Sequence, residues 1–508
     1  MAADPRKDTY DAVVVGSGIA GLAAAAFIAQ AGKDVLLCEQ SDGPGGYARA
    51  FKRGDYVFDP AIHATPQAHD YDLPAAIYRY LGIDDRLEFL KSEAFYEAAF
   101  PDFRLRPPPG FDDFIEAHVE AFPHEADAIR TFFRVCETVQ REAHERPPQL
   151  SLKELDEAAR QFPTLFKYSK ATVGDVIDEY LADPKVKAVV AALWPYAGLP
   201  PSKLSFIIFA TFVRVIVDGS FYLKGSFQSL VDALVAAFER DGGELLVNAP
   251  VADISVEDGK VTGVGLEDGT RVRTGIVVSN ADAVSTLEGM VGLEHFPRGF
   301  TRRLQRMRPS LSAVVVFGAT SMDLEPLDLA HETFFFTSFD HDKAYQDILE
   351  GRPGGMWASV PTLADPSVAP AGEHLVILSA MAAYDIGKPW EQEADRFAEE
   401  LWEAFEPSAP GVRESLSFME VATPVTLERF TRNRQGAAYG WENTPDQAGS
   451  KRSPRKPPID GLYLTGHWTT PGSTSLRVLV SGVHTAMIVL AENGWGSIDL
   501  QHPELPPL

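Results

Sequence analysis

Three glycines near the amino terminus have the spacing of a nucleotide-binding turn. Gly16, Gly18 and Gly21 form the pattern Gly-x-Gly-x-x-Gly directly after an apolar run. In such a turn the first glycine permits the tight bend, the second lets the backbone approach a pyrophosphate, and the third lets helix and strand pack closely. The N-terminus of the following helix offers free N–H groups and a partial positive charge to phosphates. The motif predicts a bound dinucleotide and leaves NAD and FAD both open.

An acidic residue follows at the place where a ribose would lie. Glu39 ends a second apolar run, and a carboxylate there accepts hydrogen bonds from ribose hydroxyls and disfavours a 2′-phosphate. Residues 12–15 and 35–38 have the pattern of buried strands, and the alanine-rich residues 22–31 that of the helix between them. Inside a βαβ unit the glycine motif is a far more specific signal than it is alone. A second such unit is not found, so a separate domain for a pyridine nucleotide is not expected.

Other kinds of catalytic site find no support in the sequence. The 12 histidines are scattered, and neither His-Glu-x-x-His nor Cys-x-x-Cys occurs, so no metal site is predicted. No Gly-x-Ser-x-Gly turn is present, which argues against a serine hydrolase. The functional interpretation therefore depends on the nucleotide motif.

Length and composition indicate a folded protein of two or three domains. The chain has 508 residues, of which 45% are hydrophobic and 23% charged, so disorder as the main state is excluded. The net charge of −26 argues against a nucleic acid as partner and against electrostatic docking to anionic lipid. Two cysteines, Cys38 and Cys136, indicate a reducing compartment, so we expect a cytoplasmic protein. No apolar stretch is long enough to predict a membrane-spanning helix, although peripheral contact through apolar insertion stays open.

The remaining sequence predicts helices first and strands later. Residues 70–200 carry long amphipathic patterns that indicate a mostly helical insertion. After a helix predicted at 227–240, a meander of short strands spans 244–278. The prediction is completed by strands at 311–317, 375–381 and 461–465 and by helices at 390–405 and 480–493.

Several motifs beyond Glu39 resemble those of the phytoene desaturase group. This group includes carotenoid isomerases and retinol saturases and belongs to the amine-oxidase-like flavoprotein superfamily. Residues 42–46 and 58–63 are similar to the start of these proteins. Residues 254–282, with the ending Val-Val-Ser-Asn-Ala-Asp, are similar to a second segment near their cofactor. Residues 459–466, Ile-Asp-Gly-Leu-Tyr-Leu-Thr-Gly, look like their closing cofactor motif.

The resemblance implies FAD, bound in an extended pose without a covalent link. Its pyrophosphate would lie at the glycine turn, its ribose at Glu39 and its adenine at the backbone of Val251. Gly466, Ser481 and Gly482 would lie near the flavin, with N–H donors from a helix that begins near Ser481. The implied cofactor-binding residues are Gly16, Gly18, Gly21, Glu39, Gly45, Gly46, Arg49, Val251, Gly466, Ser481 and Gly482.

The resemblance also implies the fold class, which is α/β with α+β. A Rossmann-type FAD-binding domain is expected to be interleaved with a substrate domain of mixed sheet and helices. The FAD-binding domain would be discontinuous, over residues 1–70, 220–290 and 455–508. The substrate domain would take residues 71–219 and 291–454.

The implied activity is that of an FAD-dependent oxidoreductase that desaturates, saturates or isomerises a hydrophobic polyene or isoprenoid. His63 is the first candidate for proton transfer, because a histidine with a pKa near neutrality moves protons at physiological pH. His467, directly after the closing glycine, would lie beside the flavin; many relatives carry an acidic or amide residue there. Tyr439 and Arg429 are further candidates.

Aromatic residues in two segments allow two interpretations. They could line a hydrophobic tunnel for the substrate, or they could fill an ordinary core. The residues are Phe206, Phe209, Phe212, Phe221 and Tyr222 in one segment and 334–336 in the other.

Two alternative functions stay open. One is an amine-oxidase-type flavoenzyme that acts on a small amine and releases hydrogen peroxide. The other is a prenyl-binding escort protein, which shares this architecture without redox work. The intact glycine motif together with Glu39 counts against the escort function.

Overall fold

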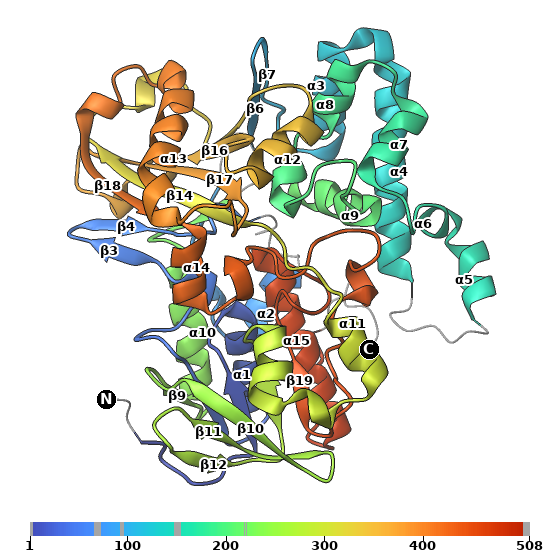
Figure 1. The fold of residues 1–508 in the computed structure, drawn as a ribbon, viewed down its shortest axis with the longest axis vertical. Coiled ribbons are helices and arrows are strands. Elements are labelled where there is room, and N and C mark those ends of the chain that lie inside the picture. The colour runs from blue at the N-terminus through green and yellow to red at the C-terminus, as the bar shows by residue number, and fades with distance from the viewer. Residues whose placement is uncertain are drawn as a thin grey trace.

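The strands predicted at the amino terminus lie side by side in a five-stranded parallel sheet, in the lower part of Figure 1. The computed structural model describes residues 4–65, 73–91, 96–146, 154–217, 219 and 221–500. Across the sheet the order is β19 (Leu462–Leu464), β13 (Val277–Ser279), β1 (Ala12–Val15), β2 (Val35–Cys38) and β9 (Glu244–Leu246). The sheet therefore joins strands from three distant parts of the chain.

Helix α1 (Ile19–Gln30) connects β1 to β2 and lies at the centre of this unit. Its alanine-rich sequence favours a helix, and small side chains let its neighbours approach closely. Helices α10 (Gln228–Arg240) and α15 (Ser475–Glu492) both pack on it. A Cβ on Gly482 of α15 would lie 2.4 Å from the carbonyl oxygen of Ala20, so this contact requires glycine. The sheet and two helices thus fix α1 and the glycine turn at its start.

The bounds and packing of α15 differ from the sequence prediction. The helix begins at Ser475, whereas residues 480–493 were predicted, so Ser481 lies inside it and not at its N-terminus. Among the residues that the structure describes, α15 is the one helix long and apolar enough to cross a membrane, but 56% of the residues in that stretch are buried. Packing on α1 explains its apolar character as that of a core helix.

The predicted meander forms a separate antiparallel sheet of three strands. These are β10 (Val251–Glu257), β11 (Lys260–Leu266) and β12 (Arg271–Arg273). Strand β9, which the prediction placed at the start of the meander, instead pairs in parallel with β2. Its apolar residues complete the edge of the five-stranded sheet.

A seven-stranded sheet forms the second large unit, in the upper left of Figure 1. Helix α13 (Trp390–Phe405), which matches the predicted bounds, packs on one of its faces. Two of its strands come from the segment predicted to be helical, which corrects that prediction. The order is β18 (Leu416–Ala422), β14 (Ser312–Thr320), β17 (His374–Ala382), β16 (Gly355–Ser359), β15 (Glu332–Phe336), β6 (Glu97–Phe100) and β7 (Phe103–Leu105).

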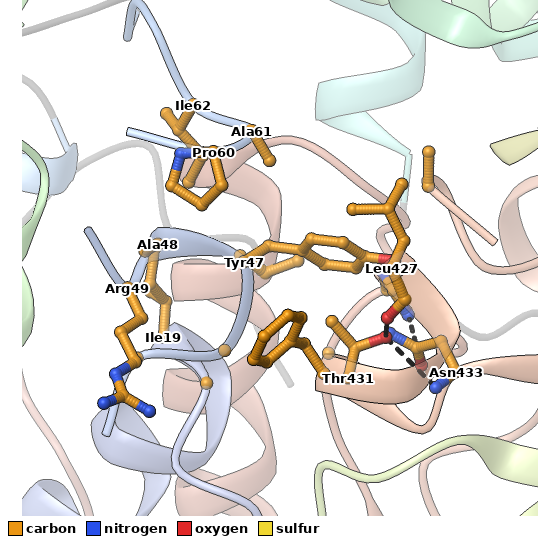
Figure 2. A pocket seen from close by; sticks show the side chains of 18 of the residues that line it. Ile19, Tyr47, Ala48, Arg49, Pro60, Ala61, Ile62, Leu427, Thr431 and Asn433 are labelled. Atoms are coloured by element: carbon orange, nitrogen blue, oxygen red, sulfur yellow. Dashed lines mark hydrogen bonds between the residues drawn. The ribbon is translucent and has the colours of Figure 1, made fainter. Parts of the chain in front are cut away.

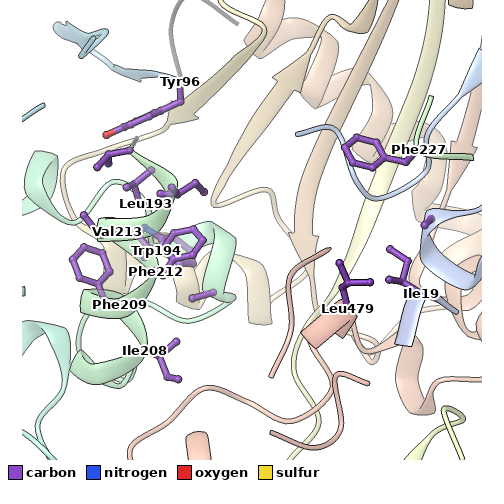
Figure 3. Close-up of a cluster of buried hydrophobic side chains, with 14 of the residues drawn as sticks. Ile19, Tyr96, Leu193, Trp194, Ile208, Phe209, Phe212, Val213, Phe227 and Leu479 are labelled. Carbon is purple, nitrogen blue, oxygen red and sulfur yellow. The ribbon is translucent and has the colours of Figure 1, made fainter. Parts of the chain in front are cut away.

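A helical region lies beside the seven-stranded sheet, in the upper right of Figure 1. Figure 3 shows its core, in which Leu193, Trp194 and Phe209 lie close to Val213 and Tyr96. Its helices are α3 (Phe111–Ala121), α4 (Ala126–Glu145), α5 (Leu155–Gln161), α6 (Pro163–Lys167), α7 (Val173–Tyr180), α8 (Pro184–Val190) and α9 (Phe206–Ile216).

Short elements connect these units. They are β3 (Phe51–Arg53), β4 (Tyr56–Phe58), α2 (Leu73–Leu81), β5 (Phe89–Lys91), β8 (Phe221–Leu223), α11 (Arg298–Leu304), α12 (His341–Leu349) and α14 (Pro424–Thr431). The parallel sheet with its α1 crossover and the mixed sheet with its helices confirm the predicted fold class. The domain boundaries stay a prediction, and all five parallel strands lie within the segments assigned to the FAD-binding domain.

Candidate active site

A cavity of about 1180 Å³ runs from the carboxyl edge of the five-stranded sheet to the face of the seven-stranded sheet that is turned away from α13. Four residues that directly follow or nearly follow parallel strands line it: Gly16, Glu39, Asn280 and Gly466. Ligands of open parallel sheets bind outside the carboxyl ends of the strands. Figure 2 shows part of the wall, where the side chain of Tyr47 extends toward Leu427 of α14 and residues 60–62 lie above it.

At one end of this cavity, the glycine turn exposes main chain that no side chain covers. Gly16 has a φ of +90°, a conformation that favours glycine. A Cβ on Gly21 would lie 2.0 Å from the carbonyl oxygen of Gly16, so only glycine allows α1 to pack against the turn. Helix α1 starts after Gly18 without a side-chain cap, and Ile19 and Ala20 line the cavity. Its first N–H groups are therefore placed to meet an anion.

A second glycine turn packs against the first. Gly45 donates its N–H to the carbonyl oxygen of Ser17 at 3.0 Å, and its φ is +126°. A Cβ on Gly46 would lie 3.2 Å from the Cα of Gly18. The two turns form a cradle of bare main chain. A Cβ on Gly21 or on Gly46 would crowd it, which fits the close approach of a pyrophosphate.

Glu39 is buried beside the cradle and held by two serines. The backbone N–H and hydroxyl of Ser17 donate to Oε2 at 2.9 and 2.5 Å. The backbone N–H and hydroxyl of Ser41 donate to Oε1 at 2.9 and 2.7 Å. These bonds fix the orientation of a carboxylate that lines the cavity, where ribose hydroxyls would meet it.

The other predicted cofactor residues are only partly on the cavity wall. Val251 and Arg49 line it, and Arg49 forms an ion pair with Asp42 at 2.7 Å. Ser481 and Gly482 lie behind the wall, which corrects the direct contact predicted for them. The Ser481 hydroxyl accepts the N–H of Gly466 at 3.0 Å and so supports the closing glycine from inside α15.

Asn280 joins the two ends of the cofactor site. Its position after β13 was noted from sequence, but its role was not predicted. A Cβ on Gly18 would lie 2.6 Å from Asn280 Nδ2, and a Cβ on Gly466 would lie 2.4 Å from Asn280 Oδ1. The amide thus packs against an early and a late glycine at once. Only tertiary structure brings these three residues together.

His63 lies on the cavity wall, in a setting that the sequence did not predict. It is buried, and Nε2 lies 3.2 Å from the carbonyl oxygen of Asp59. Burial, aided by the neighbouring His331, lowers the pKa of His63 to about 4. The imidazole is therefore neutral at physiological pH, which corrects the expectation of a pKa near neutrality.

Glu332 is an ionisable residue of the cavity that sequence reasoning missed. Its carboxyl group accepts hydrogen bonds from the hydroxyls of Tyr196 and Ser359, and Oε1 lies 3.8 Å from His63 Nδ1. Burial raises the pKa of Glu332. Alternation along β15 places Glu332 on the same face as Phe334, and this signal could have identified it.

His467 and Tyr439 also line the cavity, but both are engaged. His467 Nε2 lies 3.3 Å from Asn433 Oδ1, and burial lowers the pKa of His467 to about 3. The Tyr439 hydroxyl donates to the carbonyl oxygen of Pro195 at 3.0 Å, and burial raises its pKa. Arg429 is exposed and does not line the cavity, so the structure does not support it as a site residue.

The far end of the cavity is an apolar chamber. Both aromatic segments contribute to it, through Phe212 of α9 and Phe334 of β15. Other members of these segments fill the core, as Phe206, Phe209 and Tyr222 do. Both interpretations of the aromatic residues are therefore partly correct. The chamber is lined by Phe212, Ile216, Ala313, Val315, Phe317, Phe334, Trp357 and Met381.

Fold and cradle together define a dinucleotide-binding protein whose cavity continues into an apolar chamber. The chain matches the family described as flavin containing amine oxidoreductase over residues 19–490 and belongs to that family. It is an FAD-dependent oxidoreductase, and FAD is its cofactor. The bare main chain of the two glycine turns and the fixed carboxylate of Glu39 fit this group.

Curated relatives cover nearly the whole chain. Prolycopene isomerase 2 from an Oncidium hybrid cultivar is 27% identical over 96% of this chain and 85% of its own length. A lycopene-forming phytoene desaturase from Paracoccus sp. is 27% identical, covering 95% and 97% of the two chains. All-trans-retinol 13,14-reductase from Danio rerio is 24% identical, covering 90% and 82%.

Solved structures share the fold at low sequence identity. An oxidoreductase from Methanosarcina mazei has a TM-score of 0.63 at 17% identity and covers 95% of this chain and 99% of its own. Cyclohexylamine oxidase from Brevibacterium oxydans has a TM-score of 0.60 at 17% identity, covering 94% and 99%. A Rab GDI from Plasmodium falciparum has a TM-score of 0.52 at 11% identity, covering 97% and 99%.

Proposed function

We propose that this enzyme acts on a hydrophobic polyene or isoprenoid, by desaturation, saturation or double-bond isomerisation. The observation that carries the proposal is that one cavity continues from the glycine cradle into the apolar chamber. Burial of apolar surface there favours binding by about 25 cal/mol per Å². The names of the relatives, a prolycopene isomerase, a phytoene desaturase and a retinol reductase, support the same substrate class.

FAD supplies the redox step when bound, because it accepts or donates a hydride. Desaturation also releases one proton, and saturation takes one up. We propose that Glu332 transfers this proton, since burial raises the pKa of its carboxyl group and so makes it a better proton donor than an exposed carboxyl group. Tyr196 and Ser359 hold it in place.

The structure gives no comparable support to the alternative of a small amine. A protonated amine in the chamber would meet the guanidinium of Arg477, which lines the same cavity. The likeness to cyclohexylamine oxidase is one of fold at 17% identity. An escort role without redox work is disfavoured by the intact cradle and the fixed carboxylate of Glu39.

Anaerobic titration of the flavin-loaded protein tests the proposal. Linear polyenes and small amines are added separately, flavin absorbance is followed, and the polyene products are analysed for saturation state and double-bond geometry. We expect a polyene either to change the flavin spectrum or to be isomerised, and amines to do neither. Flavin bleaching by amines alone, with hydrogen peroxide formed on readmission of air, would refute the proposal. Gly18→Ala protein, expected to lack flavin, is the control for reactions that need no cofactor.

A cytoplasmic location, with at most peripheral membrane contact, is part of this proposal. Both cysteines are buried and unpaired, as in a reducing compartment. A membrane contact would give an apolar substrate a short route to the chamber. Cell fractionation with and without a high-salt wash tests the location: recovery only in detergent extracts would contradict it.

A further inference from the structure

Arg477 differs from the other arginines of the cavity wall. Arg49, Arg53 and Arg432 each form an ion pair with a carboxylate, at 2.7 Å in every case. Arg477 has no carboxylate within 4.0 Å among the residues that the structure describes. Its charge is thus left without a counter-ion on the wall of a cavity that holds a substrate.

The position of Arg477 makes an unbalanced charge more costly. The residue lies in the first turn of α15, where the helix dipole is positive and a cation is disfavoured. Burial lowers the pKa of Arg477 to about 10, and its charge acts against that of Arg452, which is itself buried. A guanidinium with this pKa still carries its charge at pH 7. An anion from outside the protein would relieve both the desolvation and the repulsion.

The hydrogen-bond geometry leaves Arg477 free to bind such an anion. Nη2 donates to the Thr211 hydroxyl at 2.9 Å, and that hydroxyl donates onward to the carbonyl oxygen of Ile207. Of the five N–H donors of a guanidinium, this is the one with an acceptor in the described part of the chain. The others remain for a planar acceptor, for which an arginine is suited by its fork of donors.

Arg477 is hydrogen-bonded on the chamber side of the cavity and not to a residue of the glycine cradle. Its partner Thr211 belongs to α9, whose Phe212 and Ile216 line the chamber and which contributes nothing to the cradle. The phosphates of the cofactor belong at the cradle, so they are not the anion that this position fits. The anion that this position fits is an end group of the substrate.

We propose that the substrate is a polyene with a carboxylate at one end and that Arg477, positioned by Thr211, binds this carboxylate. The inference rests on the proposed function, since it places a polyene in the chamber. Bidentate pairing would fix how far the chain enters, and therefore which carbon–carbon bond lies at the flavin. Arg477 would then determine the position of reaction along the polyene.

The test compares a polyene acid with its neutral ester. All-trans-retinoic acid and methyl retinoate are titrated into FAD-loaded protein at pH 7, and binding is read from the perturbation of the flavin spectrum. Wild type should bind the acid at least about 10-fold more tightly than the ester, because the ester lacks one hydrogen-bonded charge. Arg477→Gln should bind both equally and keep its flavin. Thr211→Val should reduce the preference several-fold, and Arg130→Gln, at an exposed arginine of α4 that does not line the cavity, should leave it unchanged.

Four results would overturn the inference. Equal binding of acid and ester by wild type would do so while leaving the polyene function intact. A preference for the acid that survives in Arg477→Gln would exclude Arg477 as the binding group. Loss of flavin from Arg477→Gln would assign the residue to the cofactor. Binding of neither compound would instead remove the proposed function, and this inference with it.

Discussion

The imidazole of His63 faces the carboxyl group of Glu332 across 3.8 Å, from Nδ1 to Oε1, in the wall of the substrate chamber. Burial acts on both groups in the direction of neutrality, because it lowers the pKa of His63 to about 4 and raises that of Glu332. The pair is therefore not an ordinary salt bridge. It is a carboxyl group with a raised pKa beside an imidazole with a lowered pKa.

Replacing Glu332 with Gln should stop proton transfer while keeping the shape of the chamber. We expect turnover of a polyene to fall by about 10²- to 10⁴-fold, the usual contribution of a general acid or base. If Glu332 acts as base, the wild-type rate rises with pH through its raised pKa, and the variant lacks this limb. Measured flavin content and a pH–rate profile check both points. Unchanged turnover with full flavin content would remove Glu332 from the mechanism.

Replacing His63 with Gln should have a smaller effect. The imidazole is already neutral above its pKa of about 4, so it contributes no ionisation between pH 6 and 8. We expect the shape of the pH–rate profile to stay the same in this range, with turnover reduced by less than about 10-fold through altered support of Glu332. Disappearance of an ionisation near pH 6.5 from the profile would show instead that His63 titrates during catalysis.

Replacing Gly18 with Ala should remove the cofactor without unfolding the chain. The added Cβ would enter the cradle 2.6 Å from Asn280 Nδ2, while the backbone at Gly18 suits any residue. We expect FAD affinity to fall at least about 10-fold, a cost of about 1.4 kcal/mol. Flavin absorbance of the purified protein and titration of the apoprotein measure it.

Gly32→Ala is the matched control at the other end of α1. Gly32 has a φ of +76° with nothing within 4 Å of an added Cβ, so the substitution strains the backbone by about 1–2 kcal/mol and blocks no ligand. The melting temperature should fall and flavin content should stay. Equal loss of flavin in both variants would mean that the cradle does not depend on a bare Gly18.

Acid should destabilise the fold through buried histidines. His118 packs between Phe114 and Phe133, and burial lowers its pKa to about 4. Because the folded state binds this proton less tightly than the unfolded state, stability is lost as pH falls from about 6.5 toward 4, by up to about 3 kcal/mol. Between pH 7 and 4.5, the melting temperature of the His118→Leu variant should fall less than that of the wild type. His144→Leu, on the exposed side of α4, should behave as wild type does.

Local signals in the sequence were sufficient for the first glycine turn of the cofactor site. The strand, the glycine turn and the alanine-rich helix around Gly18 are adjacent in the chain, so periodicity and residue type determine them together. Strand β9 and the hairpin of β6 and β7 were misplaced because each is short and pairs with a strand far away in sequence. Pairing, and not propensity, decides such strands.

The substrate half of the site could not be predicted in the same way. Glu332 and Arg477 are ordinary charged residues in the sequence. Their significance comes from the fold, which gives Glu332 buried hydrogen-bond donors and places Arg477 near no described carboxylate. The same is true of His63, whose type suggested proton transfer while its burial keeps it neutral. Environment sets a pKa, and environment is a property of the folded chain.

The late arrival of β19 and Gly466 has a consequence for biosynthesis. Strand β13 pairs on one side with β1 and on the other with β19, two strands that lie far apart in the sequence. A ribosome must therefore synthesise β19 and Gly466 before the crevice for the prosthetic group is closed. We expect flavin to load only after that point, and a nascent chain that stalls before Gly466 to yield a colourless protein.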